Sequence, residues 1–301
     1  MLGKSSATYK KWVEEQKRYL HMPETLDAIN LGSTCDANNF DYSLWSGVNG
    51  FNLASAPQDM YYDQQLLEQY GVRLKKNGVV FISISEFAFL CDRYNLEDHN
   101  YKYYWYLESD RIINYSHRTD RMLRKYPGLL DSRYMKQEIK QIVKEILRTD
   151  KSTASASMES KAQKMMSNWV HEFGWDAGCV IREEQRETIK RSQEIFEADI
   201  RFCKKRQLTP VVIIPPFEEH LISLMPNEVL DECLWRIIDG IKSCGIKVIS
   251  FWKDNELQKE QYYSTPICLN EEGKRLFNRR LQEIMDNHLE ATAEIRDIIW
   301  N

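Results

Sequence analysis

The sequence has no excess of basic residues: 41 Lys and Arg stand against 45 Asp and Glu, which gives a net charge of −4. Domains that bind nucleic acid usually carry a basic patch or a basic excess, so the composition does not point to nucleic acid. The sequence also lacks an apolar stretch of the roughly 20 residues that a membrane-spanning helix needs. We therefore expect no nucleic-acid partner and no membrane span in this chain.

The N-terminal stretch MLGKSSATYKKWVEEQKRYLHMPE lacks the apolar core of a signal peptide. A cytoplasmic chain is expected as the sequence is written, while an anchor ahead of its first residue stays open. No pair of cysteines has the CxxC spacing of a structural zinc site, so we expect no metal and no other cofactor. The odd number of cysteines without a secretory signal indicates reduced thiols. The seven cysteines are Cys35, Cys91, Cys179, Cys203, Cys233, Cys244 and Cys268.

What is present is typical of a globular protein: 43% of the 301 residues are hydrophobic and 29% are charged. This length fits one large α/β domain with an insertion, or two domains. Aromatic residues are plentiful, with 16 Tyr, 11 Phe and 8 Trp. Such residues line carbohydrate clefts, but a large core uses them too, and the core is the favoured interpretation.

Apolar runs that end in turn residues predict five strands with helices between them. The strands are expected near 27–33, 49–54, 78–85, 210–215 and 246–251. The alternation predicts a doubly wound parallel sheet, in which ligands bind beyond the carboxyl ends of the strands. Three loops meet there: those after Ser33, Asn52 and Trp252. Asn270 is expected to cap the last helix and Gly245 to end the one before the last strand.

The alternation of strands and helices breaks at residues 92–180, which are expected to form a mainly helical insertion. Ile139, Ile142, Val143 and Ile146 recur at helical spacing within it. The low-complexity stretch 150–163 predicts a mobile loop. Residues 105–118 are either a lid over the cleft or, in the favoured interpretation, part of the packing of the insertion.

Four segments in order resemble a known group of proteins: INLGSTCDANNFDYS, GFNLASAPQDMYYDQQLL, NGVVFISISEF and TPICLNEEGKRLF. The chain resembles the SGNH, or GDSL-like, hydrolase superfamily, and more narrowly the SGNH-like proteins of bacterial surface-polysaccharide gene clusters. The match covers about 26–90 and 208–285. The resemblance implies a flavodoxin-like, three-layer α/β sandwich with strand order 2-1-3-4-5, formed as one domain over 1–301 with 92–180 inserted in it.

The resemblance also implies site residues. The family nucleophile, a Ser after the first strand, falls on Ser33. The family's oxyanion donors are that Ser's backbone N–H, a Gly after the second strand and an Asn after the third. The Gly position falls near Pro57 and the Asn position near Ser85.

The family's Asp-x-x-His pair, which supplies the catalytic base and its orienting acid, falls on Thr265 and Cys268. A His that many relatives carry shortly after the nucleophile is replaced by Cys35. A serine hydroxyl is a weak nucleophile without an adjacent base, and a thiol is a poor substitute for an imidazole. Ordinary Ser-His-Asp hydrolysis is therefore not expected.

Three alternative kinds of chemistry stay open for this site. His220, with Glu218 or Glu219 to orient it, is a candidate base from a new direction. Either Cys35 or Cys268 is a candidate nucleophile, because a helix N-terminus lowers a thiol pKa. The same two cysteines are also a candidate disulfide or metal pair. In each case the simpler interpretation, an exposed loop His or a buried thiol that fills space, is favoured.

The remaining candidates are loop residues. Asn52 and Gln58 lie at the edge of the expected site, where they either bind substrate or hold the loop. Ser85 and Cys35 complete the candidate oxyanion and substrate-binding set. Asp36 and Asp41 are interpreted as turn residues. Tyr61 and Tyr62 are interpreted as packing residues.

The sequence thus predicts an SGNH-hydrolase-like protein with a degenerate triad, related to carbohydrate esterases and O-acyltransferases. It is expected to be either weakly active on acyl esters or a non-catalytic binder of a glycan or partner. The alternative is a ligand-binding or redox-sensing module that uses Cys35 and Cys268 without esterase chemistry. Whether it is an enzyme, and its oligomeric state, stay open at this stage.

Overall fold

The computed structural model describes residues 3–85, 87–91, 97–133, 135–137, 139–140, 156–175 and 181–290. The chain divides into two compact units. The larger unit combines Glu24–Asp92 with Ala156–Asn301, and the smaller unit combines Met1–Pro23 with Arg93–Ser155. No helix in the described part of the chain combines the length and the apolar character needed to cross a membrane.

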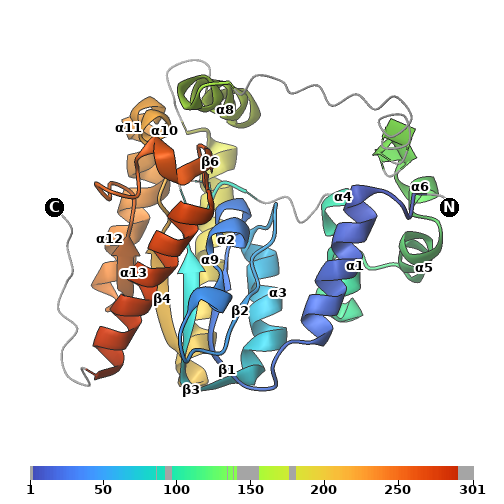
Figure 1. The fold of residues 1–301 in the computed structure, drawn as a ribbon, viewed down its shortest axis with the longest axis horizontal. Coiled ribbons are helices and arrows are strands. Elements are labelled where there is room, and N and C mark those ends of the chain that lie inside the picture. Colours follow the sequence, from blue (N-terminus) through green and yellow to red (C-terminus); the bar gives the residue numbers. More distant parts are fainter. Residues whose placement is uncertain are drawn as a thin grey trace. The chain divides into compact units, whose positions relative to one another are not determined.

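The larger unit is built on a parallel sheet of five strands in the order β2-β1-β3-β4-β5. Helices surround the sheet in a three-layer α/β fold (Figure 1). The fold class and the strand order predicted from the sequence are therefore confirmed. The strands are β1 (Leu26–Leu31), β2 (Gly50–Asn52), β3 (Leu74–Ser83), β4 (Thr209–Ile214) and β5 (Lys247–Ser250).

The α-helices in the described part of this unit are α2 (Thr34–Asn39), α3 (Met60–Tyr70), α8 (Met158–Phe173), α9 (Glu183–Lys205), α10 (Glu219–Leu224), α11 (Asn227–Leu230), α12 (Arg236–Ser243) and α13 (Glu271–Glu290). Single helical turns occur at η1 (Tyr42–Leu44), η2 (Gly71–Arg73) and η7 (Glu260–Tyr262), and η6 (Asp231–Trp235) is a π-helical turn between α11 and α12. Two short strands, β6 (Tyr263–Thr265) and β7 (Cys268–Leu269), form a separate antiparallel pair.

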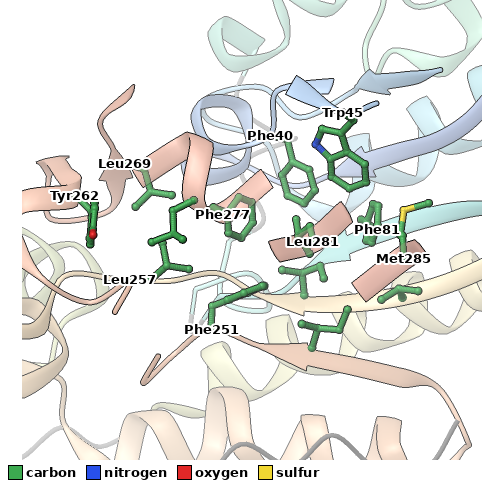
Figure 2. Close-up of a cluster of buried hydrophobic side chains, with 14 of the residues drawn as sticks. Phe40, Trp45, Phe81, Phe251, Leu257, Tyr262, Leu269, Phe277, Leu281 and Met285 are labelled. Carbon is green, nitrogen blue, oxygen red and sulfur yellow. The ribbon is translucent and has the colours of Figure 1, made fainter. Parts of the chain in front are cut away.

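Alternation along the strands divides the core between the two faces of the sheet. Val79 and Phe81 of β3 join a cluster with Phe277 and Leu281 of α13. Figure 2 shows Phe277 among Phe40, Phe251 and Leu281, and the Phe40 and Phe277 rings meet edge to face at 5.3 Å. Val80 and Ile82, which alternate with them along β3 and are also buried, point to the opposite face.

The ends of several elements follow the sequence chemistry. β4 ends at Ile214, before Pro215 and Pro216, which cannot donate to a neighbouring strand. Asn270 caps α13 as predicted, because its Oδ1 accepts from the N–H groups of Glu272 (3.1 Å) and Gly273 (3.0 Å). Gly245 follows α12 with a φ of 72°, which confirms its expected place after the helix end.

Helix α8 corrects one expectation about the segment 150–163. Residues 158–163 are helical, so the prediction of a mobile loop is wrong for them. Ser157 starts the helix by accepting a hydrogen bond from the N–H of Ser160 at 3.3 Å. Met158, Ala162 and Met166, at i, i+4 and i+8, form its buried face. Residues 150–155 lie outside the described residues.

The smaller unit contains α1 (Ala7–Leu20), α4 (Glu97–Asn100), η4 (Tyr103–Trp105), η5 (Ser109–Arg111), α5 (His117–Lys125) and α6 (Pro127–Leu130). Aromatic contacts join its two sequence segments: Tyr19 stacks on Tyr106 with ring centroids 4.2 Å apart, and Tyr9 meets Trp105 edge to face at 5.5 Å. Residues 105–118 belong to this unit, and their expected role as a lid or as packing stays a prediction.

The two compact units divide the helices on either side of the expected insertion. The N-terminal helix α1 belongs with residues 93–155, whereas α8 belongs with the sheet. That residues 92–180 form a mainly helical insertion within a single domain stays a prediction. Part of it, including Ile142, Val143 and Ile146, lies outside the described residues.

Candidate functional site

The Gly32–Ser33 turn lies at the carboxyl end of β1, where it leads directly into α2. Gly32 has a φ of 135°, a backbone conformation that residues other than glycine rarely adopt. A Cβ at Gly32 would also collide with the carboxylate of Asp36. Glycine at this position therefore lets the Asp36 side chain lie against the backbone just before Ser33.

Both polar groups of Ser33 hydrogen-bond within the protein. Its backbone N–H donates to Asp36 Oδ2 at 3.1 Å. Its Oγ accepts from the backbone N–H of Gln58 at 3.1 Å. The amide of Ser33 is therefore already occupied by a carboxylate, whereas the amide of Gln58 points at the Ser33 hydroxyl.

Two buried carboxyl groups flank the turn. Burial raises the pKa of Asp36 to about 7, against the opposing effect of hydrogen bonds from the Ser83 hydroxyl and the Ser33 N–H. Burial likewise raises the pKa of Asp63 to about 7, and the nearby Asp36 adds to the rise. Asp63 Oδ1 accepts from Gly32 N–H at 2.9 Å and from Gln58 Nε2 at 2.7 Å. The interpretation of Asp36 as a turn residue is wrong, because Asp36 lies within α2, where it is buried.

The side chains of Asn52 and Gln58 hold the loops around Ser33. Asn52 Nδ2 donates to the carbonyl oxygens of Asp36 and Phe40, both at 3.0 Å, and its Oδ1 accepts from Asn30 Nδ2 at 2.8 Å. Gln58 is buried and its amide donates to Asp63. These contacts favour the loop-holding role over substrate binding for both residues. Ser85 lies half-buried just beyond β3, and its expected part in an oxyanion hole stays a prediction.

Thr265 and Cys268 are paired across the short β6–β7 hairpin. The backbone N–H of Cys268 donates to Thr265 Oγ1 at 3.2 Å. Thr265 is exposed and Cys268 is half-buried. Burial raises the pKa of the Cys268 thiol, Asp36 raises it further, and Thr265 and Lys274 act in the opposite direction. The thiol is therefore held in its neutral form.

Hydrogen bonds fasten the helix after Ser33 to the strand that carries Cys268. Asn38 Nδ2 donates to the carbonyl oxygen of Leu269 at 2.9 Å, and Leu269 N–H donates to Asn39 Oδ1 at 3.1 Å. Asn278 of α13 donates to the carbonyl oxygen of Asn39 at 2.7 Å. The structure thus brings together the Ser33 and Cys268 segments, although the direct alignment of the two side chains stays a prediction.

Cys35 is buried with 8% of its surface exposed. It lies near Tyr263 of β6 and contributes, after burial, to a raised pKa of that phenol. The six cysteines in the described part of the chain are all free thiols. The expected possibility of a Cys35–Cys268 disulfide therefore does not describe this structure.

Glu218 and His220 form a pair at the end of the β4 loop. Glu218 is fully buried, and its Oε1 lies 2.5 Å from His220 Nδ1. The hydrogen bond to Glu218 raises the pKa of His220 above its usual value, and the charges of Glu219 and Glu159 add to this rise. The backbone N–H of Glu218 donates to the carbonyl oxygen of Pro266 at 3.0 Å, which fastens the pair to the hairpin of Thr265 and Cys268.

Ligand atoms of Glu218, Glu219 and His220 lie within 4.8 Å of one another, which makes them the group in the described part of the chain that could hold a metal ion. The Glu218 carboxylate, however, already accepts from His220 N–H (3.0 Å) and Leu221 N–H (3.3 Å) besides contacting the imidazole. A cation would have to displace these bonds, so the contacts favour an acid–histidine pair.

Sequence reasoning missed the parts played by Asp36 and Asp63, and it named Glu218 as one of two alternatives to orient His220 without its burial. For Asp36 a signal was present, because Ser33-x-x-Asp36 has the spacing of a capping box, in which the third helical residue accepts from the backbone N–H of the cap. For Asp63 and Glu218 the sequence offers no local signal, since their burial depends on elements distant in the chain.

Comparisons with known proteins add a likeness at the level of the fold. No protein-family model and no curated protein matches the sequence. Among solved structures, the chain is similar to a crystal structure of a candidate acylhydrolase from Bacteroides fragilis NCTC 9343. The sequence identity is 7%, the TM-score is 0.46, and the match covers 92% of this chain and 96% of that chain. A likeness of this extent assigns no residue role here.

Proposed function

We propose that the chain is an SGNH-hydrolase-like protein whose Ser33 site accepts an acyl ester of a carbohydrate without ordinary Ser-His-Asp catalysis. The order of its four matching segments supports the assignment, as does a Gly-Ser turn at the end of the first strand of a 2-1-3-4-5 sheet. The carbohydrate ester is the substrate class that the resemblance implies.

The observation that carries this proposal is the bonding of the Thr265–Cys268 hairpin. At the positions of the family's acid and base, a threonine hydroxyl accepts from the backbone N–H of a cysteine whose thiol pKa is raised. A neutral thiol does not take a proton from a serine hydroxyl at neutral pH, and a threonine hydroxyl cannot stabilise an imidazolium. Ser33 is therefore without the base that would make it a nucleophile from this direction.

The surroundings of Ser33 limit catalysis further. One N–H that the family uses for the oxyanion, that of Ser33 itself, donates to Asp36. The N–H of Gln58 points at the Ser33 hydroxyl and is the donor best placed to replace the family's glycine. Loss of a triad base typically lowers the rate by several powers of ten. The rate enhancement that remains is supplied by substrate binding and by the oxyanion donors. Slow turnover or simple binding is the expected outcome.

The alternative, a redox-sensing module built on Cys35 and Cys268, receives less support. A reactive thiol needs a lowered pKa and access to solvent. Burial raises the pKa of Cys268, and Cys35 is buried. Thiol titration with and without oxidant tests it, and we expect neither cysteine to react faster than the exposed Cys244.

An aryl-ester assay tests the proposal. We expect the natural chain and Ser33→Ala to turn over substrate at similar, low rates. The double substitution Thr265→Asp and Cys268→His should add a Ser33-dependent activity of at least about tenfold, within the range that general base catalysis supplies. The triple variant that also carries Ser33→Ala is the matched control. Efficient hydrolysis by the natural chain, at the roughly 1–10³ per second usual for enzymes and lost in Ser33→Ala, would refute the proposal.

A further inference from the structure

The loop after β4 carries an acid–histidine pair, Glu218 and His220, at the edge of the sheet where Ser33 lies. Pro215 and Pro216 end the strand, and Glu218 follows as the first capping residue of α10. The Glu218 N–H bonds to the carbonyl oxygen of Pro266, which stands between Thr265 and Cys268 in the sequence. The pair is therefore joined to the very hairpin that has lost the family's acid and base.

Glu218 holds the imidazole of His220 in one orientation. Its Oε2 accepts from the N–H groups of His220 and Leu221, at 3.0 and 3.3 Å, so the carboxylate itself cannot turn. Its Oε1 is hydrogen-bonded to Nδ1 of His220, and the two atoms lie 2.5 Å apart. With Nδ1 committed to the carboxylate, Nε2 is the ring nitrogen left to exchange protons with a reactant. His220 is half-buried, and its side chain is 36% exposed, so water reaches it.

We propose that His220, oriented by Glu218, is the general base of this site and acts on water, so that ester hydrolysis proceeds without Ser33. This inference rests on the proposed function, because it assumes that an acyl ester binds at this edge of the sheet. Nε2 takes a proton from water as the water oxygen bonds to the acyl carbon. The ester C–O bond then breaks, and the imidazolium returns the proton to the leaving oxygen, so that one acid and one alcohol form.

Water is the favoured nucleophile because the side chains of His220 and Ser33 bond to other groups. The imidazole of His220 contacts Glu218, and Ser33 Oγ accepts from the Gln58 N–H. The carboxylates that raise the pKa of His220 are those of Glu218, Glu219 and Glu159. These negative charges also stabilise the imidazolium that forms once water has given up its proton.

The acidic surroundings define the expected pH dependence. Glu218 first, and then Glu219 and Glu159, raise the pKa of His220 above its usual value. The neutral imidazole, which is the active form of a base, therefore becomes dominant only at a pH above that usual value. Hydrolysis should rise with pH along the titration of His220.

The test measures hydrolysis of phenyl acetate by EDTA-treated full-length protein. Phenoxide leaves less readily than p-nitrophenoxide, so phenyl acetate is less open than a nitrophenyl ester to direct attack by surface imidazoles. We expect His220→Asn to lower the rate above background by about 10²-fold, the typical contribution of a general base. The exposed control His171→Asn should leave the rate unchanged. Ser33→Ala is measured beside it to detect any turnover that depends on Ser33. Folding of each variant is checked by urea unfolding.

A second readout is independent of activity. Titration of the imidazole signals by NMR should give His220 a pKa above the usual value for histidine. Glu218→Gln should lower that pKa toward the usual value, whereas Glu219→Gln should lower it less. Glu218 is buried, so urea unfolding is used to show whether Glu218→Gln folds. If Glu218→Gln does not fold, the hydrolysis rate of His220→Asn still tests the inference.

Three results would overturn the inference. The first is a rate in His220→Asn equal to that in His171→Asn, which includes the case of no turnover above background. The second is loss of activity in EDTA with recovery on adding Zn²⁺, which would make the Glu218–His220 group a metal site. The third is turnover that depends on Ser33 and not on His220. Only efficient turnover of this third kind also refutes the proposed function, so the two failures are distinguishable.

Discussion

Asp36 and Asp63 show how single residues shape the site. Both carboxyls are buried, both accept backbone N–H groups of the Gly32–Ser33 turn, and burial raises the pKa of each to about 7. A buried carboxyl with such a pKa is partly protonated near neutral pH. The segment that would hold a nucleophile is thus fixed by two weak acids whose charge depends on pH.

The stability of the protein should consequently fall as pH rises. In the unfolded chain these groups ionise near their usual pKa of 3.8, whereas in the folded protein they keep their protons until about pH 7. Between about pH 4 and pH 7 the folded state binds more protons, so raising the pH favours unfolding, with an effect on the order of 4 kcal/mol for each group over the whole range. Urea unfolding at pH 5 and pH 8 measures the difference.

Asp63→Asn is the matched variant for this measurement. Its amide oxygen still accepts from Gly32 and Gln58 but does not ionise, so the free energy of unfolding should depend less on pH than in the natural chain. Stability that increases from pH 5 to pH 8, or an unchanged dependence in Asp63→Asn, would show that these carboxyls are not the cause.

At the scale of elements, the junction of α2 with β7 decides whether the site exists. Helix α2 has six residues, and β7 has two. Elements this short are not stable alone, so their positions depend on side chains that join them. Asn38, Asn39 and Asn278 supply those links.

We expect Asn39→Ala to lower the free energy of unfolding by about 1–3 kcal/mol, because it leaves the buried N–H of Leu269 without its partner. Asn38→Ala, which removes a half-buried side chain from the same helix, should cost at most about 1 kcal/mol. Urea unfolding of the two variants compares them directly. Equal losses would mean that the buried bond to β7 does not hold the junction together.

At the scale of the whole molecule, the sheet could be predicted because its signals are local. The run from Val79 to Ile82 reads as a strand covered on both faces, and Pro215 marks where β4 must end. The 2-1-3-4-5 order then came from the alternation of elements and from the resemblance. These features depend on residues close together in the sequence or on a known pattern.

The remainder depended on contacts between distant segments. The strands β6 and β7 are too short for the sequence to show the alternation of apolar and polar residues that identifies a strand. The position of this hairpin depends on hydrogen bonds between Leu269 and helix α2. The approach of Glu218 to Pro266 joins loops 48 residues apart, as their numbers show. The sequence named Ser33, Thr265, Cys268 and His220 as candidates, with Glu218 or Glu219 to orient His220, but not the roles of the buried acids Asp36 and Asp63.

The central claim is that Ser33 is not an activated nucleophile in this protein. The most direct measurement is labelling with a fluorophosphonate, which reacts with serines that have a catalytic base, followed by mass spectrometry of the intact chain and mapping of the labelled residue. The account predicts no adduct at Ser33 of the natural chain under conditions that label a standard serine esterase fully, and an adduct at Ser33 in the Thr265→Asp, Cys268→His variant. Rapid, complete labelling of Ser33 in the natural chain would contradict it.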